Sequence, residues 1–324
     1  MSSDILNSCT DKKLLSPKSL RQYFGLFVLV GITLFFSIFT KYFFTLSNFT
    51  IMLTQGSTLL IASMGMTLVI LAGSIDLSMG SLIGLGAVLS AGFSEKLGAF
   101  SFVIAVGAGV ILGSISGLLH SKGKIPSFIA TLGMLTVARG IVFLYTQGNP
   151  IVAESDFMTE LGIGRFLGIP NIVLFAFIVA IIMICITNNT VFGRWVRGIG
   201  CSERMIGLSA VPIEKVKFLI FVISGGLAAL AGSVQAARIG SGVPTTGTGQ
   251  ELDVIAAVVI GGASMTGGVG HCLGTVVGVY IMTILGTGLD LMGVGAYEQM
   301  VVKGVVLALA VLLSVDRKRI VVMK

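Results

Sequence analysis

The sequence contains few charged residues. Only 11% of its 324 residues are Asp, Glu, Lys or Arg, whereas 55% are hydrophobic and the mean hydropathy is +1.03. A soluble domain carries about 25% charged residues, because its surface must face water. This scarcity of charge excludes a soluble globular fold and predicts a protein embedded in a bilayer through most of its length.

Catalytic and metal-binding signals are also scarce. The four cysteines show neither disulfide nor metal-ligand spacing: Cys9, Cys185, Cys201 and Cys272. His120 and His271 have no partner ligands beside them, which favours roles in loops or interfaces. The chain has no G-x-x-x-x-G-K-S/T phosphate-binding loop, nucleophile elbow or zinc motif. We therefore expect no cofactor, no metal and no ATP hydrolysis by this chain alone, and an enzyme is disfavoured.

Apolar runs, by contrast, follow one another from end to end. The candidate spans are 23–44, 51–73, 78–93, 98–119, 126–146, 171–187, 216–237, 254–270, 272–292 and 298–314. The first is longer than the apolar core of a signal peptide and is expected to stay uncleaved. The segments 78–93 and 254–270 are short and interrupted by glycine, which indicates either half-helices or segments buried within the bundle. We predict an all-α polytopic membrane protein with about ten transmembrane helices.

The basic residues predict an orientation, because Lys and Arg concentrate in short cytoplasmic loops. Fifteen of the 21 basic residues fall on one side: Lys12, Lys13, Lys18, Arg21, Lys122, Lys124, Arg194, Arg197, Arg204, Lys215, Lys217, Arg317, Lys318, Arg319 and Lys324. The opposite loops hold mostly acids: Glu95, Glu154, Asp156, Glu160, Glu251 and Glu298. We expect a cytoplasmic segment 1–22, a membrane domain 23–314 and a cytoplasmic tail 315–324. The net charge of +7 is a topology signal, and no nucleic-acid partner is expected.

Small residues recur at four-residue spacing, which lets membrane helices approach closely. They are Gly80/Gly84, Gly109/Gly113/Gly117 and Gly274/Gly278. Such faces support helix packing and say nothing of a substrate.

A faint internal repeat relates two aspartates. Asp76 in Ile-Asp-Leu and Asp253 in Leu-Asp-Val are each followed eight residues later by a glycine. We place Asp76 at the inner end of its span and Asp253 at the outer end, as an inverted repeat would, and transporters are often built this way. Chance is the alternative for two such short matches.

Several polar residues fall inside or beside the spans, where burial costs several kcal/mol and usually indicates a role. Asp76 lies in a polar break that either lines a passage as unwound backbone or caps the following helix. For Arg139 and Lys303, snorkelling or an internal ion pair is preferred over direct solute contact. The acids near outer span ends either pair with Arg139, Arg238 or Lys303, or form a vestibule: Glu251, Asp253, Asp290 and Glu298.

The largest inner loop, residues 188–217, carries a short amphipathic pattern. Met205, Ile206, Leu208 and Ser209 alternate with charge at near-helical spacing. This predicts a helix that either lies on the lipid surface or docks a cytosolic partner.

Three stretches make the chain recognisable. The first is Met-Thr-Leu-Val-Ile-Leu (66–71) leading into Ile-Asp-Leu-Ser-Met-Gly-Ser (75–81). The second is Pro-Ser-Phe-Ile-Ala-Thr-Leu-Gly (126–133), followed by Ala-Arg-Gly (138–140). The third is 249–262, beginning Gly-Gln-Glu-Leu-Asp, then Gly-Gly-Val-Gly (267–270) and Gly-Thr (274–275). With these stretches, the chain resembles the permease subunits of ribose-type, monosaccharide-importing ABC transporters over nearly its whole length.

The resemblance implies a fold similar to that of the vitamin B12-type importer permeases, in the bacterial inner membrane. It also implies a second permease copy, a cytosolic ATP-binding subunit and a periplasmic sugar-binding protein, with membrane lipid around them. The expected translocation residues are Asp76, Ser78, Ser81, Arg139, Glu251 and Asp253. The expected ATPase-coupling residues are Gly200, Glu203, Arg204, Met205, Ile206, Ser209 and Val211.

The chain departs from the family pattern at a few positions. The family usually has Asn at Ser202, paired Ala at Met205 and Ile206, Gly at Ala210 and Asn at Thr287. A compensating groove on the ATPase explains these changes, and so does a divergent system. The alternative substrates are a branched-chain amino acid or a quorum-sensing furanosyl compound. A secondary transporter is the alternative mechanism, disfavoured here because the acids are expected near span ends.

Overall fold

The architecture is almost entirely helical, as expected for a bilayer, where helices satisfy every backbone polar group internally. The computed structural model describes residues 17–314. Its helices are α2 (Pro17–Phe39), α3 (Leu46–Leu71), α4 (Met79–Gly92), α5 (Ser94–Leu97), α6 (Phe100–Ser121), α7 (Ser127–Thr146), α8 (Asp156–Ile163), α9 (Asn171–Asn189), α10 (Val191–Cys201), α11 (Glu203–Gly207), α12 (Ile213–Ile239), α13 (Gln250–Ile260), α14 (Cys272–Leu291) and α15 (Ala296–Ser314). The strand β1 (Ile151–Val152) pairs antiparallel with β4 (Ser241–Gly242), and β2 (Arg165–Phe166) pairs with β3 (Ile169–Pro170).

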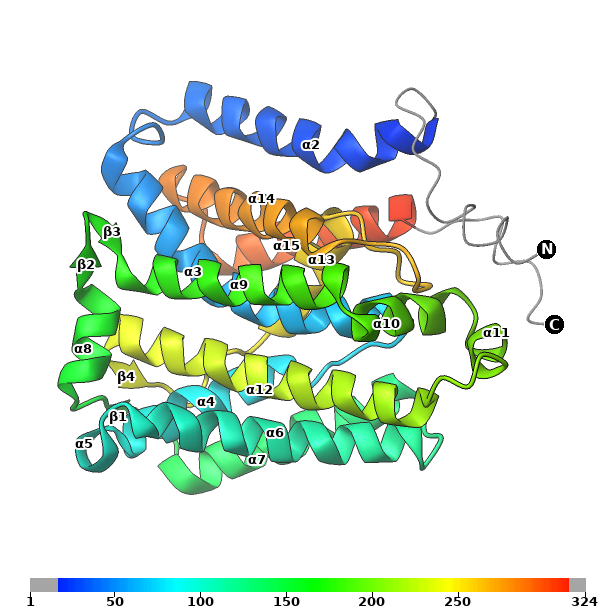
Figure 1. The fold of residues 1–324 in the computed structure, drawn as a ribbon. Coiled ribbons are helices and arrows are strands. Elements are labelled where there is room, and N and C mark those ends of the chain that lie inside the picture. Colours follow the sequence, from blue (N-terminus) through cyan, green and yellow to red (C-terminus); the bar gives the residue numbers. More distant parts are fainter. Residues whose placement is uncertain (1–16, 315–324) are drawn as a thin grey trace.

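The long helices lie side by side and leave two distinct ends (Figure 1). One end, called here the α11 end, carries α10, α11 and the loop between α6 and α7. The opposite end, called here the β end, carries α5, α8 and the four short strands. Residues 1–16 of the predicted cytoplasmic segment 1–22, and the whole predicted cytoplasmic tail 315–324, lie outside the described part of the chain.

The prediction of an all-α polytopic membrane protein is confirmed. Within residues 17–314, six helices are long and apolar enough to cross a membrane: α3, α6, α7, α9, α12 and α14. The two segments predicted to be half-helices are short, with 14 residues in α4 and 11 in α13. The predicted span 254–270 is wrong in its second half, because α13 ends at Ile260 and a glycine-rich loop follows. The left-handed backbone at Gly262, Gly267 and Gly268 does not continue a helix.

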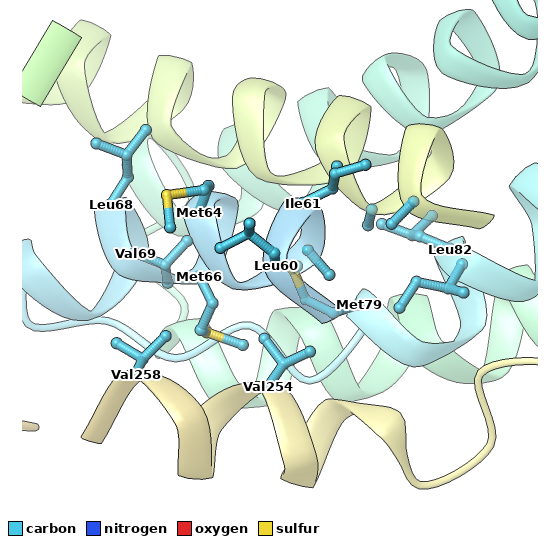
Figure 2. Packing of buried hydrophobic residues seen from close by; sticks show 14 of the residues in the cluster. Leu60, Ile61, Met64, Met66, Leu68, Val69, Met79, Leu82, Val254 and Val258 are labelled. Carbon is cyan, nitrogen blue, oxygen red and sulfur yellow. The ribbon is translucent and has the colours of Figure 1, made fainter. Parts of the chain in front are cut away.

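The centre of the bundle is formed by α3 and α12. Figure 2 shows Leu60, Met64 and Met66 of α3 packed together with residues of two neighbouring helices, Met79 of α4 and Val254 of α13. All five side chains are fully buried. The two half-helices are therefore held against α3, the most buried of the six long apolar helices.

Glycine allows the close helix contacts that the spacing predicted. A Cβ added at Gly109 or Gly113 of α6 would lie 2.4 Å from a carbonyl oxygen of α12, at Gly225 or Phe221 respectively. A Cβ at Gly278 of α14 would lie 1.8 Å from the Ala257 carbonyl oxygen of α13. These distances leave no room for a side chain, so the backbones themselves are in contact.

Candidate functional site

The break between α3 and α4 is built around the Asp76 carboxylate, which is buried. Its Oδ1 accepts hydrogen bonds from the Ser78 backbone N–H at 3.0 Å and the Ser78 hydroxyl at 2.5 Å. Its Oδ2 accepts a hydrogen bond from the hydroxyl of Ser224, near the middle of α12, at 2.8 Å. The bonds to Ser78 thus hold the break in a local turn, and the bond to Ser224 fixes the break to the centre of the bundle.

This geometry corrects the helix-capping alternative. Ser78 is the residue immediately before α4, and the Asp76 bonds stop there without reaching an N–H inside the first turn. Asp76 makes a local turn two residues long, a common use of Asp in irregular backbone.

The start of α7 supplies donors and acceptors to the same break. The Ile75 N–H donates to the Ser127 hydroxyl at 3.1 Å, and the Leu77 N–H donates to the Thr131 hydroxyl at 3.0 Å. Ser127 and Thr131 are four residues apart and therefore lie on one face of the helix. Unwound backbone inside a membrane needs such partners, because no water is available to it. Two of the recognisable sequence stretches thus form one structural unit.

Arg139 of α7 holds the loop that leads into α13. Its Nη1 donates to the carbonyl oxygens of Pro244 and Thr246 at 2.8 and 2.9 Å, and its Nη2 donates to the Gly80 carbonyl oxygen at 3.3 Å. Within residues 17–314, Arg139 has no ion pair, and its guanidinium is hydrogen-bonded to backbone carbonyls instead. Snorkelling of Arg139 stays a prediction. Glu251 interacts with Arg139 electrostatically beyond salt-bridge distance.

The two half-helices begin next to each other. A Cβ added at Gly80, in the first turn of α4, would lie 2.0 Å from the Glu251 carboxylate in the first turn of α13. From that point α4 runs toward β4, where Ala87 contacts Gly242, and α13 runs toward the start of α14, where Gly261 contacts Gly274. Half-helix N-termini that meet inside a bundle place positive dipole ends around a common region.

This arrangement corrects the predicted depths of the two aspartates. Asp76 was expected at the inner end of a span, yet it bonds Ser224 near the middle of α12. Asp253 was expected at an outer end, yet it lies in the first turn of α13, beside the start of α4. Asp76 is therefore deep in the bundle and Asp253 lies beside the start of a half-helix, so for these two residues the argument against a secondary transporter from shallow carboxylates fails.

Two further predicted residues have defined partners. The Lys303 ammonium lies 2.8 Å from Asp253 Oδ2, which confirms the ion pair expected for Lys303. The Ser81 hydroxyl donates to the Ser78 carbonyl oxygen at 2.9 Å, so it also stabilises the start of α4.

The predicted coupling segment forms two helices rather than one. The Thr190 hydroxyl accepts from the Gly193 N–H at the start of α10, and the Ser202 hydroxyl accepts from the Met205 N–H at the start of α11. No residue of α11 is buried, and the Met205 side chain is 53% exposed. The predicted amphipathic helix ends at Gly207, so Leu208 and Ser209 follow it in a turn.

Glu203 and Ala210 of the coupling segment have specific structural features, an ion pair and a left-handed backbone conformation. Glu203 forms a 2.7 Å ion pair with Lys217 at the start of α12. Ala210, where the family usually has Gly, has φ +55, a left-handed conformation that favours glycine. The chain therefore carries strain at this departure from the family pattern.

The end of α10 touches the break directly. A Cβ added at Gly200 would lie 1.9 Å from the Leu71 carbonyl oxygen at the end of α3. The same oxygen accepts a hydrogen bond from the Gly268 N–H at 2.9 Å. A Cβ at Gly267 would lie 2.8 Å from the Gly73 Cα. The coupling segment, the break and the glycine-rich loop after α13 therefore meet at one point.

The two histidines lie at helix ends, His120 in the last turn of α6 and His271 just before α14. The His120 ring bonds the Ser74 hydroxyl at 3.3 Å and the Ile125 carbonyl oxygen at 2.8 Å. Burial lowers the pKa of His271, which lies just before α14, and the nearby Arg197 lowers it further. Between residues 17 and 314, no three His, Cys, Asp or Glu side chains are grouped closely enough to hold a metal ion.

Sequence reasoning missed some of the residues that build the site. Ser224 lies in an apolar helix outside the recognised stretches, yet its hydroxyl bonds Asp76. Thr67 and Thr275 stood within recognised stretches, but nothing there indicated that their hydroxyls bond each other at 2.8 Å. Ser127 and Thr131 stood within a recognised stretch, but nothing in that stretch named the break as their partner.

Comparisons with known proteins found relatives that match nearly the whole chain. Residues 48–311 match the family described as branched-chain amino acid transport system / permease component. The chain is 41% identical over 312 residues to the ribose import permease protein RbsC of Escherichia coli (strain K12), covering 94% of this chain and 95% of the relative. It is 40% identical to the RbsC of Bacillus subtilis (strain 168), over 93% and 94% of the two chains.

A more distant relative has another substrate in its name. The chain is 33% identical to the autoinducer 2 import system permease protein LsrC of Salmonella typhi, over 89% of this chain and 83% of that one. No solved structure matches.

Proposed function

The chain belongs to the family of branched-chain amino acid transport system permease components, and from that premise we propose that it is the membrane-spanning subunit of an ATP-driven importer of a ribose-like monosaccharide. Relatives in this family are transport subunits and not enzymes. The work of ATP hydrolysis is assigned to a separate cytosolic ATP-binding subunit, and sugar delivery to a periplasmic sugar-binding protein.

One observation carries the mechanism. Gly200, at the end of the proposed coupling helix α10, lies against the Leu71 carbonyl, where the break that contains Asp76 begins. An added Cβ at Gly200 would be 1.9 Å from that carbonyl oxygen. If the ATP-binding subunit moved α10 and α11, the backbone at the start of the break would therefore be displaced directly. Packed cores and interfaces switch between discrete arrangements rather than deforming continuously, so a small displacement here is enough to change access.

The region between the two half-helix N-termini is the proposed translocation pathway. Glu251 and Asp253 stand in the first turn of α13, while Ser78 and Ser81 shape the start of α4. Asp76 and Arg139 fix the flanking backbone and are positioning residues in this scheme.

The α11 end is the proposed docking surface for the ATP-binding subunit. Its residues are Gly200, Glu203, Arg204, Met205, Ile206, Ser209 and Val211. Docking is favoured over a resting position on lipid because α11 offers no buried face, and Met205 and Leu208 are 53% and 87% exposed. Exposed apolar residues rimmed by charge are typical of protein interaction sites.

The remaining architecture follows from the same scheme. We propose a membrane domain 23–314 of about ten spans arranged as an inverted repeat, as in vitamin B12-type importers, with the loop 188–217 and both termini cytoplasmic. The α11 end then faces the cytoplasm and the β end faces the periplasm, across the bacterial inner membrane. A second permease copy completes the pore within the lipid.

The substrate proposal favours a sugar over the other candidates. Similarity to ribose import permeases extends over more than nine-tenths of both chains at 40–41% identity, compared with 33% for the autoinducer 2 permease. A branched-chain amino acid, named in the family description, is zwitterionic and would require two unpaired charges of opposite sign along the pathway. Asp253 and Lys303 are instead paired with each other.

Uptake into proteoliposomes tests the proposal. The permease is reconstituted with its ATP-binding subunit and binding protein, and uptake of radiolabelled D-ribose and L-leucine is followed with ATP inside the vesicles. We expect ATP-dependent ribose uptake that requires both partners. Uptake by the permease alone under an ion gradient would favour a secondary transporter, and preference for leucine would overturn the sugar assignment.

A further inference from the structure

A polar cavity of about 220 Å³, partly open at one side, lies between helices of the subunit, apart from the break at Asp76. Five helices wall it: α3, α12, α13, α14 and α15. Its size is below the roughly 300–1,000 Å³ of sites for drug-sized ligands, so it suits a single small ring. Of the residues named in the translocation scheme above, only Asp253 lines this space.

The wall combines amide, hydroxyl and charged groups. Four glutamine side chains face it, Gln55, Gln235, Gln250 and Gln299. Gln250 donates to the Gln235 side-chain oxygen at 3.4 Å, which leaves the Gln235 amide N–H groups and the Gln250 carbonyl for a ligand. An amide presents a donor and an acceptor side by side, which matches the paired hydroxyls of a sugar.

The charged groups of the wall balance one another. Asp253 is paired with Lys303, and Asp290 accepts a hydrogen bond from Gln299 at 2.6 Å. Arg238 adds a second cation, so the wall holds two cations and two carboxylates. The formal charges of the wall cancel, and both carboxylates already have a donor, Lys303 or Gln299, which favours a neutral polar ligand over a cation.

Two buried polar atoms in the wall have no protein partner. They are the Thr58 hydroxyl oxygen and Arg238 Nε, and Thr58 is only 5% exposed. Buried polar groups in native proteins are nearly always hydrogen-bonded, so an unpaired one in a cavity wall indicates a missing partner. Gly286 leaves further room, because a Cβ added there would meet nothing within 4 Å.

We propose that this cavity is a monosaccharide-binding site within the permease subunit itself. The inference rests on the proposed sugar transport and deepens it, because it adds a site to the single chain. Asp253 belongs to both the cavity wall and the first turn of α13, so the site adjoins the proposed pathway. A sugar released from the binding protein would be held there before the pathway opens to the other side.

Equilibrium binding of radiolabelled D-ribose to the purified permease in nanodiscs, without ATPase or binding protein, tests the site. We expect saturable binding by the wild-type chain. Gly286→Phe fills the cavity and should abolish binding, whereas Gly304→Phe, at another glycine with nothing within 4 Å, should leave it unchanged. Thr58→Val removes only the unpaired hydroxyl and should weaken binding about 3–10-fold. Ser63→Ala, on the same helix and also unpaired but outside the cavity, is its control.

The result separates this inference from the proposed function. No ribose binding by the wild-type permease, or equal binding by Gly286→Phe in a monodisperse preparation of normal thermal midpoint, overturns the cavity site. If the complete transporter still imports ribose in that case, the proposed function stands. If the complete transporter fails to import ribose, the proposed function fails, and the nanodisc measurement still decides the cavity by itself.

Discussion

The Ser224 hydroxyl donates a hydrogen bond of 2.8 Å to the Asp76 carboxylate, although 148 positions separate the two residues in the chain. Both side chains are buried, and the bond ties the break between α3 and α4 to the middle of α12. A buried acceptor left without its donor costs about 1–3 kcal/mol, so this single contact is a large part of what fixes the break.

Ser224→Ala should therefore destabilise the protein by about 1–3 kcal/mol and reduce ribose uptake, because one carboxylate oxygen loses its donor. The thermal midpoint in detergent and proteoliposome uptake measure the two effects. Ser116→Ala is the matched control, since Ser116 is buried and its hydroxyl has no partner. Equal effects of the two substitutions would show that the bond to Asp76 has no special role.

Thr131→Val keeps the shape of the side chain but removes the acceptor for the Leu77 N–H. We expect a loss of about 1–3 kcal/mol in stability and a loss of uptake, because backbone in the break has no water to replace the hydroxyl. Thr136→Val on the exposed face of α7, where the hydroxyl bonds only the Gly133 carbonyl of its own helix, should be nearly neutral. A wild-type thermal midpoint for Thr131→Val would contradict the prediction.

Gly200→Ala places a Cβ 1.9 Å from the Leu71 carbonyl and so pushes α10 away from the break. We expect ATP hydrolysis by the assembled transporter to continue while ribose uptake falls by about tenfold or more, because the step that fails is transmission, about 1.4 kcal/mol or more. Gly304→Ala, with open space around it, controls for the change of residue. Uptake and hydrolysis that fall together would place the defect in folding or docking.

Charge reversal at Glu203 or Arg204 should lower transport while membrane insertion stays normal. Glu203→Arg removes the ion pair with Lys217, but the pair is partly exposed and contributes about 0–1 kcal/mol, so stability should hardly change. Co-purification of the ATP-binding subunit and ATP-dependent uptake measure the effect. Glu95→Arg, at the β end, is the control. Normal uptake in both the Glu203 and Arg204 variants would exclude this loop as the docking site.

Ala210→Gly should stabilise the protein by about 0.5–1 kcal/mol. The gain comes from removing a left-handed alanine, and the greater freedom of glycine in the unfolded chain offsets part of it. Ala310→Gly, inside α15, should destabilise by a similar amount because glycine is a poor helix former. The difference in thermal midpoint between the two variants checks both signs.

Much of the fold could be predicted because hydropathy acts locally. The apolar runs predicted the helices, and the short, glycine-interrupted stretch at 78–93 predicted the half-helix α4. The prediction of a span over 254–270 was wrong beyond Ile260. Gly262, Gly267 and Gly268 are compatible with a membrane helix by composition, but they adopt left-handed backbone conformations. Only the tertiary structure shows that Gly73 lies against Gly267 and Cys201 against Gly268, which leaves no room for a side chain at either glycine.

The candidate site was predicted less well. Asp76, Arg139 and Asp253 stand out in the sequence because charge is rare in such a chain, and no contact needs to be known to identify them. Their roles depended on partners far away in sequence. Arg139 bonds backbone carbonyls that carry no side-chain signal, and Asp76 bonds a serine indistinguishable from others in apolar helices.

The sequence by itself therefore determined that the chain lives in a bilayer, roughly where its helices lie and which few polar residues interrupt them. These properties follow from the free-energy cost of placing charge and unpaired backbone in hydrocarbon. That cost depends on the sequence of each segment by itself. The tertiary structure decided that α4 and α13 begin side by side and that Gly200 touches the break. It also decided that a polar cavity lies between α3 and four other helices. Such features arise from packing between segments distant in the chain, and no local pattern contains them.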